Sequence, residues 1–243
     1  MAIEPAETGH PPAAGVALGV AVVLAVVTGF VDAVAFARLV GVFPANQSGN
    51  LIFFGMAIGG WPGPSGWRNA VAIGGYVVGV TLAFAVGRRL PRARRGPVLL
   101  AVELALLVAV IVVAGPIDSS HLRDGAEGMV LIVLLSVAMG VQTEVITRVA
   151  GIMVATTYET GAITRAGEAV TRLLRRDGSM GRADRQFAVL FFVVAAYVGG
   201  AAVGVSALGE WRWALFLPCA VLAALAACWL ARPQQFPGGA GDG

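Results

Sequence analysis

The sequence predicts an all-α fold, a polytopic bundle of helices integral to a membrane, and three observations support this. Of the 243 residues, 58% are hydrophobic and only 13% are charged, about half the charged fraction of a soluble domain. The mean hydropathy is +0.82. Six segments stay apolar over the roughly 20 residues that a helix needs to cross a bilayer. Lipid accepts such an apolar exterior, whereas in water it would cause aggregation.

The six predicted spans are rich in Gly, Ala and Val, which allows helices to pack closely. They cover residues 15–37, 69–87, 97–115, 128–147, 186–208 and 211–231. A polar tail precedes them at residues 1–13, and a tail over residues 232–243, with several Pro and Gly, is expected to be disordered.

Two further segments, 42–60 and 151–172, are apolar but begin with a polar cluster. The first cluster reads Phe43-Pro44-Ala45-Asn46-Gln47-Ser48-Gly49-Asn50, and the second reads Thr156-Thr157-Tyr158-Glu159-Thr160-Gly161. The apolar part that follows is short for a full crossing. Polar backbone at membrane depth is tolerated only where protein or a wet cavity surrounds it. We therefore expect two re-entrant helices that begin within the membrane.

These motifs indicate an internal repeat. The run Gly29-Phe30-Val31-Asp32 precedes Ser48-Gly49, and the run Gly140-Val141-Gln142-Thr143 precedes Thr160-Gly161. The first repeat covers residues 14–115 and the second covers residues 128–231, on either side of a loop at 116–127. Each unit is expected to hold one span, one short polar-headed helix and two more spans. Because three crossings is an odd number, the two repeats would be inverted.

Arginine runs in the loops over 88–95 and 172–185 set the predicted orientation, because basic loops stay in the cytoplasm. With both short helices re-entrant, these two loops lie on one side. With both crossing fully, the loops would lie on opposite sides. Crossing by the first short helix alone also satisfies the arginine runs but breaks the symmetry. The re-entrant topology places the 116–127 loop outside and both termini in the cytoplasm.

A candidate binding site lies between the beginnings of the two short helices. A helix N-terminus presents unpaired N–H groups and a partial positive charge, which suits an anion or a small polar solute. The alternative is that these polar side chains only cap their own helices. The expected site residues are Asp32, Asn46, Gln47, Ser48, Gly49, Asn50, Gln142, Thr143, Thr157, Glu159, Thr160 and Gly161.

Acidic residues inside the predicted spans are costly to insert and usually face a cavity or a partner. Asp32 has two interpretations: a proton-coupling or substrate-binding group, or a structural carboxylate that binds N–H groups of the 44–50 loop. Glu103 is expected to extend toward the neighbouring arginine run. Glu144 and Arg148, four residues apart, are expected to pair along one helix.

The sequence carries no signature of an enzyme. His10 and His121 are far apart, and the spacing of Cys219 and Cys228 matches no metal or redox motif. We expect no catalytic activity, no cofactor and no metal site. The arginine runs are explained by topology and contact with anionic membrane lipid, so no nucleic-acid partner is expected.

The motifs also carry a family resemblance. Gly29-Phe30-Val31-Asp32-Ala33, Phe43 and Ser48-Gly49-Asn50 resemble the first signature of the YoaK-like family of bacterial membrane proteins, G-x-x-D-A followed by F and T-G-N. Met139-Gly140-Val141-Gln142 and Thr156-Thr157 with Thr160-Gly161 resemble its M-G-x-Q-N-A and T-T…T-G elements. Ser48 replaces the usual Thr, and Thr143 and Glu144 stand where Asn and Ala are expected.

The resemblance spans about residues 15–232 and implies a multi-pass protein of the bacterial inner membrane, in a family of unknown function. Inverted repeats with discontinuous helices recur in secondary transporters. The architecture therefore favours a small-solute transporter or channel. The alternative is a membrane scaffold, regulator or accessory subunit that transports nothing.

Overall fold

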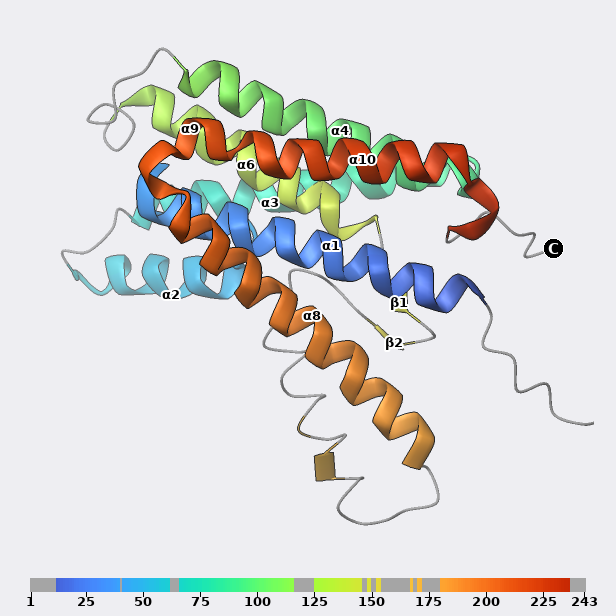
Figure 1. The fold of residues 1–243 in the computed structure, drawn as a ribbon. Helices are drawn as coiled ribbons and strands as arrows, with labels where there is room; N and C mark the ends of the chain where they lie inside the picture. Colours follow the sequence, from blue (N-terminus) through green and yellow to red (C-terminus); the bar gives the residue numbers. More distant parts are fainter. Residues whose placement is uncertain are drawn as a thin grey trace, which may run out of the picture.

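Helices make up nearly all of the part of the chain that the computed structural model describes, which is residues 12–39, 41–61, 66–115, 125–145, 148–149, 152–153, 167, 170–171 and 180–236. The longer helices are α1 (Pro12–Val34), α2 (Gln47–Ile58), α3 (Gly66–Arg89), α4 (Arg92–Ala114), α6 (Ala126–Thr143), α8 (Met180–Ser206) and α10 (Phe216–Ala231). The short ones are a π-helical turn η1 (Ala35–Leu39), α9 (Trp211–Ala214), and the 3₁₀ turns η2 (Leu208–Glu210) and η3 (Pro233–Gln235). The all-α prediction is confirmed (Figure 1).

A small antiparallel bridge is the exception to this helical fold. It joins β1 (Arg148–Val149) and β2 (Ile152–Met153), with Arg148 opposite Met153. Ile152 and Met153, near the start of the segment predicted to form the second short helix, therefore belong to a strand. The rest of that segment lies almost entirely outside the described residues.

Five described helices are long and apolar enough to cross a membrane. They run over Gly15–Arg38, Gly66–Arg89, Arg92–Ala114, Ala126–Thr143 and Phe187–Ser206, and each matches a predicted span. The sixth predicted span, 211–231, differs because it is divided into α9 and α10. Pro218 explains the division, because it has no N–H to donate to the Ala214 carbonyl four residues earlier and its ring clashes with that carbonyl. α9 ends at that residue, and α10 has 16 residues.

The C-terminal tail is ordered further than the sequence predicts. η3 follows α10, and the ring of Phe236 stacks on Trp229 with the two centroids 4.8 Å apart. Phe236 is buried by this contact. An aromatic side chain near the end of the chain thus holds residues 232–236 against the bundle, which the abundance of Pro and Gly in the tail did not suggest.

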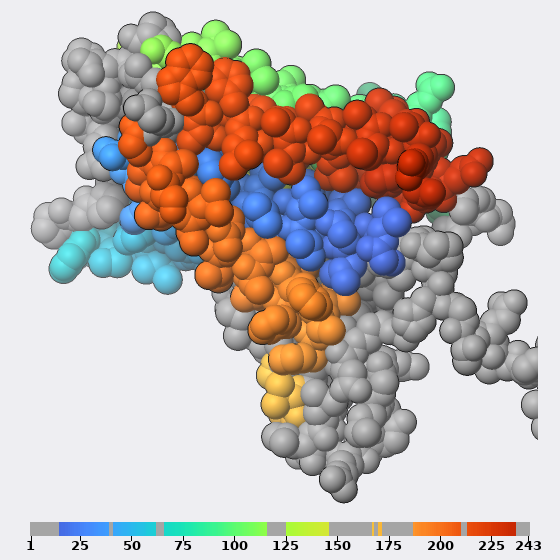
Figure 2. Space-filling model, in the orientation of Figure 1, coloured from blue at the N-terminus to red at the C-terminus, as the bar shows by residue number. Residues whose placement is uncertain are grey.

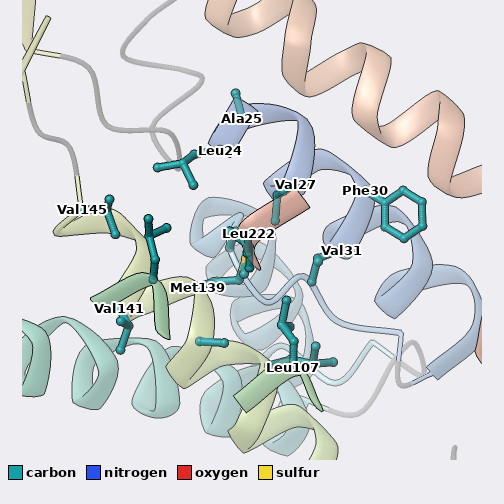
Figure 3. Close-up of a cluster of buried hydrophobic side chains, with 14 of the residues drawn as sticks. Leu24, Ala25, Val27, Phe30, Val31, Leu107, Met139, Val141, Val145 and Leu222 are labelled. Atoms are coloured by element: carbon teal, nitrogen blue, oxygen red, sulfur yellow. The ribbon is translucent and has the colours of Figure 1, made fainter. Parts of the chain in front are cut away.

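Two helix pairs form the centre of the bundle: α1 packs on α8, and α3 packs on α6. α4 packs on both α6 and α10, while α2 packs on α3 at the edge. Figure 3 shows side chains from four of these helices meeting in the core, among them Val31 of α1, Leu107 of α4, Met139 of α6 and Leu222 of α10.

Close glycine contacts set the α1·α8 crossing. A side chain on Gly29 would overlap the carbonyl oxygen of Tyr197, and a side chain on Gly200 would overlap the carbonyl oxygen of Val26. Small residues of this kind let two helix backbones approach in a membrane, where packing rather than the hydrophobic effect holds helices together.

The α3·α6 crossing repeats these contacts. A side chain on Gly140 would overlap the carbonyl oxygen of Tyr76, and one on Gly79 would overlap the carbonyl oxygen of Val137. The two α6 residues lie 111 positions after their counterparts in α1, and the two α3 residues lie 121 positions before their counterparts in α8. Two contacts of the α1·α8 crossing therefore recur, residue for residue, at the α3·α6 crossing.

The helix directions fix the path of α2. In Figure 1, α1, α4 and α8 run one way, and α3, α6 and α10 run the other way. Since α1 and α3 are antiparallel, the segment between them leaves and returns at one end of the bundle, and α2 does not cross it. α6 and α8 are likewise antiparallel, so the chain between Thr143 and Met180 also begins and ends at one end.

Candidate functional site

Asp32, close to the end of α1, binds the loop that leads into α2. Its Oδ1 accepts a hydrogen bond from the Ala45 backbone N–H at 2.8 Å, and its Oδ2 accepts one from the Asn46 N–H at 3.1 Å. The Tyr197 hydroxyl of α8 donates to Oδ2 at 2.9 Å. Asp32 is 2% exposed. The structure therefore has the carboxylate bound to N–H groups of the 44–50 loop, which was one of its two predicted roles.

α2 begins beside Asp32, and its N-terminus is capped by its own residues. Asn46 is the N-cap, and its Oδ1 accepts from the Gly49 N–H at 3.3 Å. The Ser48 hydroxyl donates to the same oxygen at 2.7 Å. The side chain of Ser48 is exposed, and those of Asn46 and Gln47 are half-buried.

Asn50 closes the loop that precedes α2. Its side-chain amide donates to the Phe43 carbonyl at 2.6 Å and to Gln47 Oε1 at 3.0 Å, and its own oxygen accepts from the Phe43 N–H at 3.0 Å. Gln47 also donates to the Pro44 carbonyl at 2.8 Å. Asn50 is fully buried, so these bonds satisfy polar groups that would otherwise be left unpaired.

Three phenylalanines stack behind this loop. The rings of Phe36 and Phe43 are nearly parallel, with their centroids 4.4 Å apart. Phe53 stacks on both, at centroid distances of 6.2 Å from Phe36 and 6.5 Å from Phe43. A side chain on Gly49 would come within 2.9 Å of the Phe43 ring, so glycine is needed for this close approach. The stack joins η1, the loop and α2, which projects from the side of the bundle (Figure 2).

Thr143 occupies in α6 the place that Asp32 occupies in α1, 111 positions earlier. Its hydroxyl donates to the Met139 carbonyl at 3.1 Å and therefore accepts the bond from the Tyr76 hydroxyl, at 2.8 Å. Tyr76 lies 121 positions before Tyr197. In each of these two bonds, a tyrosine of one predicted repeat contacts a polar side chain of the other.

Gln142 joins α6 to α1. Its side-chain amide donates to the Leu24 carbonyl at 2.9 Å and to the Thr28 hydroxyl at 2.8 Å, and Thr28 donates to the same carbonyl at 2.8 Å. Gln142 and Thr28 are both fully buried. This cluster crosses between the two predicted repeats.

The structure brings together one half of the predicted site. Asp32, Asn46, Gln47, Ser48, Gly49 and Asn50 form one connected cluster around the start of α2. Gln142 and Thr143 instead bond to the separate partners described above. The remaining predicted residues, Thr157, Glu159, Thr160 and Gly161, lie outside the described residues.

Sequence reasoning missed the two tyrosines, Tyr76 and Tyr197. A signal was present, because both stand in a Tyr-Val-x-Gly run, Tyr76 to Gly79 and Tyr197 to Gly200. The motifs that predicted the repeat are 111 or 112 residues apart, as Gly29 and Gly140 or Gly49 and Gly161 are, whereas these tyrosine runs are 121 residues apart. One fixed spacing cannot match both pairs of motifs when the segment between them differs in length.

Two predicted roles of glutamates are corrected. Glu144 and Arg148 do not lie on one helix as expected, because α6 ends at Thr143 and Arg148 lies in β1. Glu144 pairs with Arg95 of α4 at 3.1 Å. Glu103 does not extend toward the arginine run, because its side chain is fully buried in the bundle. Among the described residues, no group of three His, Cys, Asp or Glu could hold a metal ion.

Comparison with known proteins places the chain in a family. The model of a family described as "Protein of unknown function (DUF1275)" matches residues 20–228. The chain belongs to this family. It is also 28% identical over 141 residues to the UPF0700 transmembrane protein YoaK of Bacillus subtilis (strain 168), a match that spans 58% of this chain and 61% of that relative. No solved structure matches significantly. Similarity to this transmembrane relative and the five long apolar helices together indicate a multi-pass membrane protein.

Proposed function

We propose that the protein is a transporter or channel for a small polar solute, and not an enzyme, in the bacterial cytoplasmic membrane. Its surface is in contact with lipid, both termini lie in the cytoplasm, and its two halves form an inverted repeat. The solute-binding region includes the start of α2, with the exposed Ser48 hydroxyl as its accessible polar group. The observation that carries this proposal is a polar helix start, beside Asp32, inside a membrane-spanning bundle.

Equivalent contacts in the two halves support the repeat. Gly29 and Gly140 approach the carbonyl groups of Tyr197 and Tyr76 in the same way, and both tyrosines bond to equivalent positions in α1 and α6. α1 and α6 run in opposite directions, which fits inversion. Folds of this kind place their sites where helices are interrupted, near the middle of the membrane.

Charge also supports the orientation. The last turn of α3 ends in Arg88 and Arg89, and α4 begins with Arg92, Arg94 and Arg95. α1 begins, and α10 ends, at this same end of the bundle (Figure 1). Because arginine-rich turns are retained in the cytoplasm, this end is assigned to the cytoplasm.

A second candidate is a scaffold or accessory subunit, and one observation favours it. The side chains of Asp32, Asn46, Gln47 and Asn50 all bond to one another or to nearby backbone. On this proposal the cluster is purely structural: it caps the start of α2 and binds no solute. The two candidates differ in what the loss of an accessible hydroxyl would do.

The deciding experiment compares two serine variants in lipid vesicles that contain the purified protein. Osmotic shrinking and swelling is followed with glycerol, urea and acetate as named probes. Ser48→Ala removes the exposed hydroxyl at the cap, and Ser206→Ala removes an exposed hydroxyl that bonds within α8, to the Ala202 carbonyl at 3.0 Å. Transport predicts faster solute entry than in empty vesicles, reduced by Ser48→Ala and unchanged by Ser206→Ala.

If the protein is a scaffold or accessory subunit, the expected results are different. None of the three solutes would then enter faster than in empty vesicles, and none would raise the melting temperature of the detergent-solubilised protein. That combined result would contradict the transport proposal.

A further inference from the structure

Glu103 occupies the middle of α4. Eleven residues separate it from Arg92 at the start of the helix and eleven from Ala114 at the end, which is about 16 Å in either direction at ~1.5 Å per residue. Since the hydrocarbon core of a bilayer is about 30 Å thick, Glu103 lies near the middle of the membrane. Its side chain has 0% exposure.

Glu103 differs from Asp32 and Glu144 in its lack of a hydrogen-bond partner among the described residues. Within the described part of the chain, neither of its carboxylate oxygens has a hydrogen-bond partner. Asp32 and Glu144 behave differently, because Asp32 accepts three hydrogen bonds and Glu144 pairs with Arg95. An ionised carboxylate without a partner is very unfavourable in an apolar interior. Ionisable residues inside a membrane are rare and usually functional.

The buried residues one turn before and after Glu103 on α4 are apolar. Leu99, Leu100 and Leu107 of α4 are buried with it, and α4 packs on α6 and α10. The titratable groups of α10 are the buried thiol of Cys219 and the exposed thiol of Cys228. On α6, the described acidic group is Glu127, in the first turn; on α3, which makes a smaller contact, the described ionisable groups are Tyr76 and the arginines Arg68, Arg88 and Arg89.

This environment selects among possible cations. A hard metal ion such as Ca²⁺ needs six or more oxygen ligands, and no other polar atom within the described residues is within hydrogen-bond distance of the Glu103 oxygens. A proton needs one oxygen and removes the charge. The carboxyl group of Glu103 therefore fits a proton better than any metal ion.

We infer that Glu103 is a reversible proton-binding site in the middle of the bundle, where α4 meets α6 and α10. One carboxylate oxygen takes a proton from water when α4 moves away from its neighbours, and returns it to water when α4 moves away again. The packed arrangement holds the group in its neutral form. Use of this proton to drive solute movement rests on the function proposed above, whereas proton binding itself does not.

Infrared spectroscopy of the full-length protein in lipid tests the inference without any transported solute. Spectra are recorded at a series of pH values for the wild type, Glu103→Gln and Glu144→Gln. Glutamine keeps the size of the side chain but cannot bind the proton, and Glu144→Gln is the matched control on a carboxylate that has a partner. The expected result is a carbonyl band of a protonated carboxyl group that disappears reversibly at high pH, persists in Glu144→Gln and is absent from Glu103→Gln.

A second measurement keeps the test valid if Glu103→Gln fails to fold. Wild-type protein grown with ¹³C-carboxyl glutamate should show the same band at a lower frequency, which assigns it to a glutamate and excludes Asp32. Two results would overturn the inference. One is the absence of a protonated-carboxyl band that shifts with this label. The other is a band that stays constant at every pH at which the protein remains folded.

Discussion

The Tyr197 hydroxyl donates a hydrogen bond to Oδ2 of Asp32 at 2.9 Å, and so ties α8 to both α1 and the start of α2. At the α3·α6 crossing, Tyr76 makes the corresponding bond to Thr143 at 2.8 Å. The geometry recurs, but a carboxylate accepts in one half and a hydroxyl in the other. This difference makes the two tyrosines a natural pair for comparison.

Tyr197→Phe should destabilise the protein more than Tyr76→Phe. The first change removes a bond to a charged acceptor, at a cost of about 1.5–3 kcal/mol. The second removes a neutral bond between transmembrane helices, which averages about 0.6 kcal/mol. Thermal unfolding of both variants in the same detergent measures the difference. Equal shifts in melting temperature would contradict an ionised Asp32 at this bond.

Asp32→Asn should lower the melting temperature and loosen the start of α2. An asparagine has one side-chain oxygen, so it cannot accept from Ala45 N–H, Asn46 N–H and the Tyr197 hydroxyl together. At least one buried donor loses its acceptor, which costs about 1–3 kcal/mol. Hydrogen exchange at the 45 and 46 amides, read by mass spectrometry of peptides that contain them, should rise.

The control for this variant is Asp32→Asn combined with Tyr197→Phe. The two changes should be non-additive because they act on one bond. If the two destabilisations simply add, the hydrogen bond between Tyr197 and Asp32 contributes little to stability.

Gly200→Ala should disrupt the α1·α8 crossing, whereas Gly199→Ala should not. A methyl group on Gly200 would overlap the backbone of Val26, but one on Gly199 meets nothing within 4 Å. Backbone cannot rotate away as a side chain can, so overpacking of about 1–3 kcal/mol is expected for Gly200→Ala. Alanine favours a helix over glycine, so Gly199→Ala should be neutral or slightly stabilising. Melting temperatures of the neighbouring pair test this.

Cysteine labelling tests the path of α2. Single cysteines are introduced by Gly15→Cys, Arg92→Cys and Trp61→Cys, after replacement of the native Cys219 and Cys228 by serine. A membrane-impermeant maleimide should react with the first two from the cytoplasm and with the third from outside. A methylene on Gly15 meets no atom within 4 Å, so that change should not disturb α1. Labelling of residues 15 and 61 from the same side would show that α2 crosses the membrane.

The local sequence pattern was sufficient to predict one part of the candidate site, the start of α2. The polar run from Asn46 to Asn50 predicted a helix start inside the membrane, because amide and hydroxyl side chains cap helices and glycine allows close approach. The structure has this cap, with Asn46 bonded to Gly49. The role of Asp32 stayed open between two alternatives, because only the fold shows which donors lie within reach of its carboxylate.

Other partners could not be predicted, because they come from helices far apart in the sequence. Tyr197 reaches Asp32 across 165 positions, and Gln142 reaches Thr28 across 114. Glu103 was expected to extend toward nearby arginines, and the packing of α4 between α6 and α10 buries it instead. Hydropathy measures how apolar a segment is, but not which face of a helix meets a neighbour.

By itself the sequence determined that the chain is a helical membrane protein, where five of its long helices lie, and that a polar helix start interrupts the first half. These properties depend on local composition: apolar length, arginine at the ends and capping residues. Only the tertiary structure decided which helices pair, that Asp32 binds the start of α2 and that Glu103 is buried with no hydrogen-bond partner among the described residues. The pairing of α1 with α8 and of α3 with α6 depends on backbone approach at the glycine crossings, which is a property of two helices together and not of either sequence segment alone.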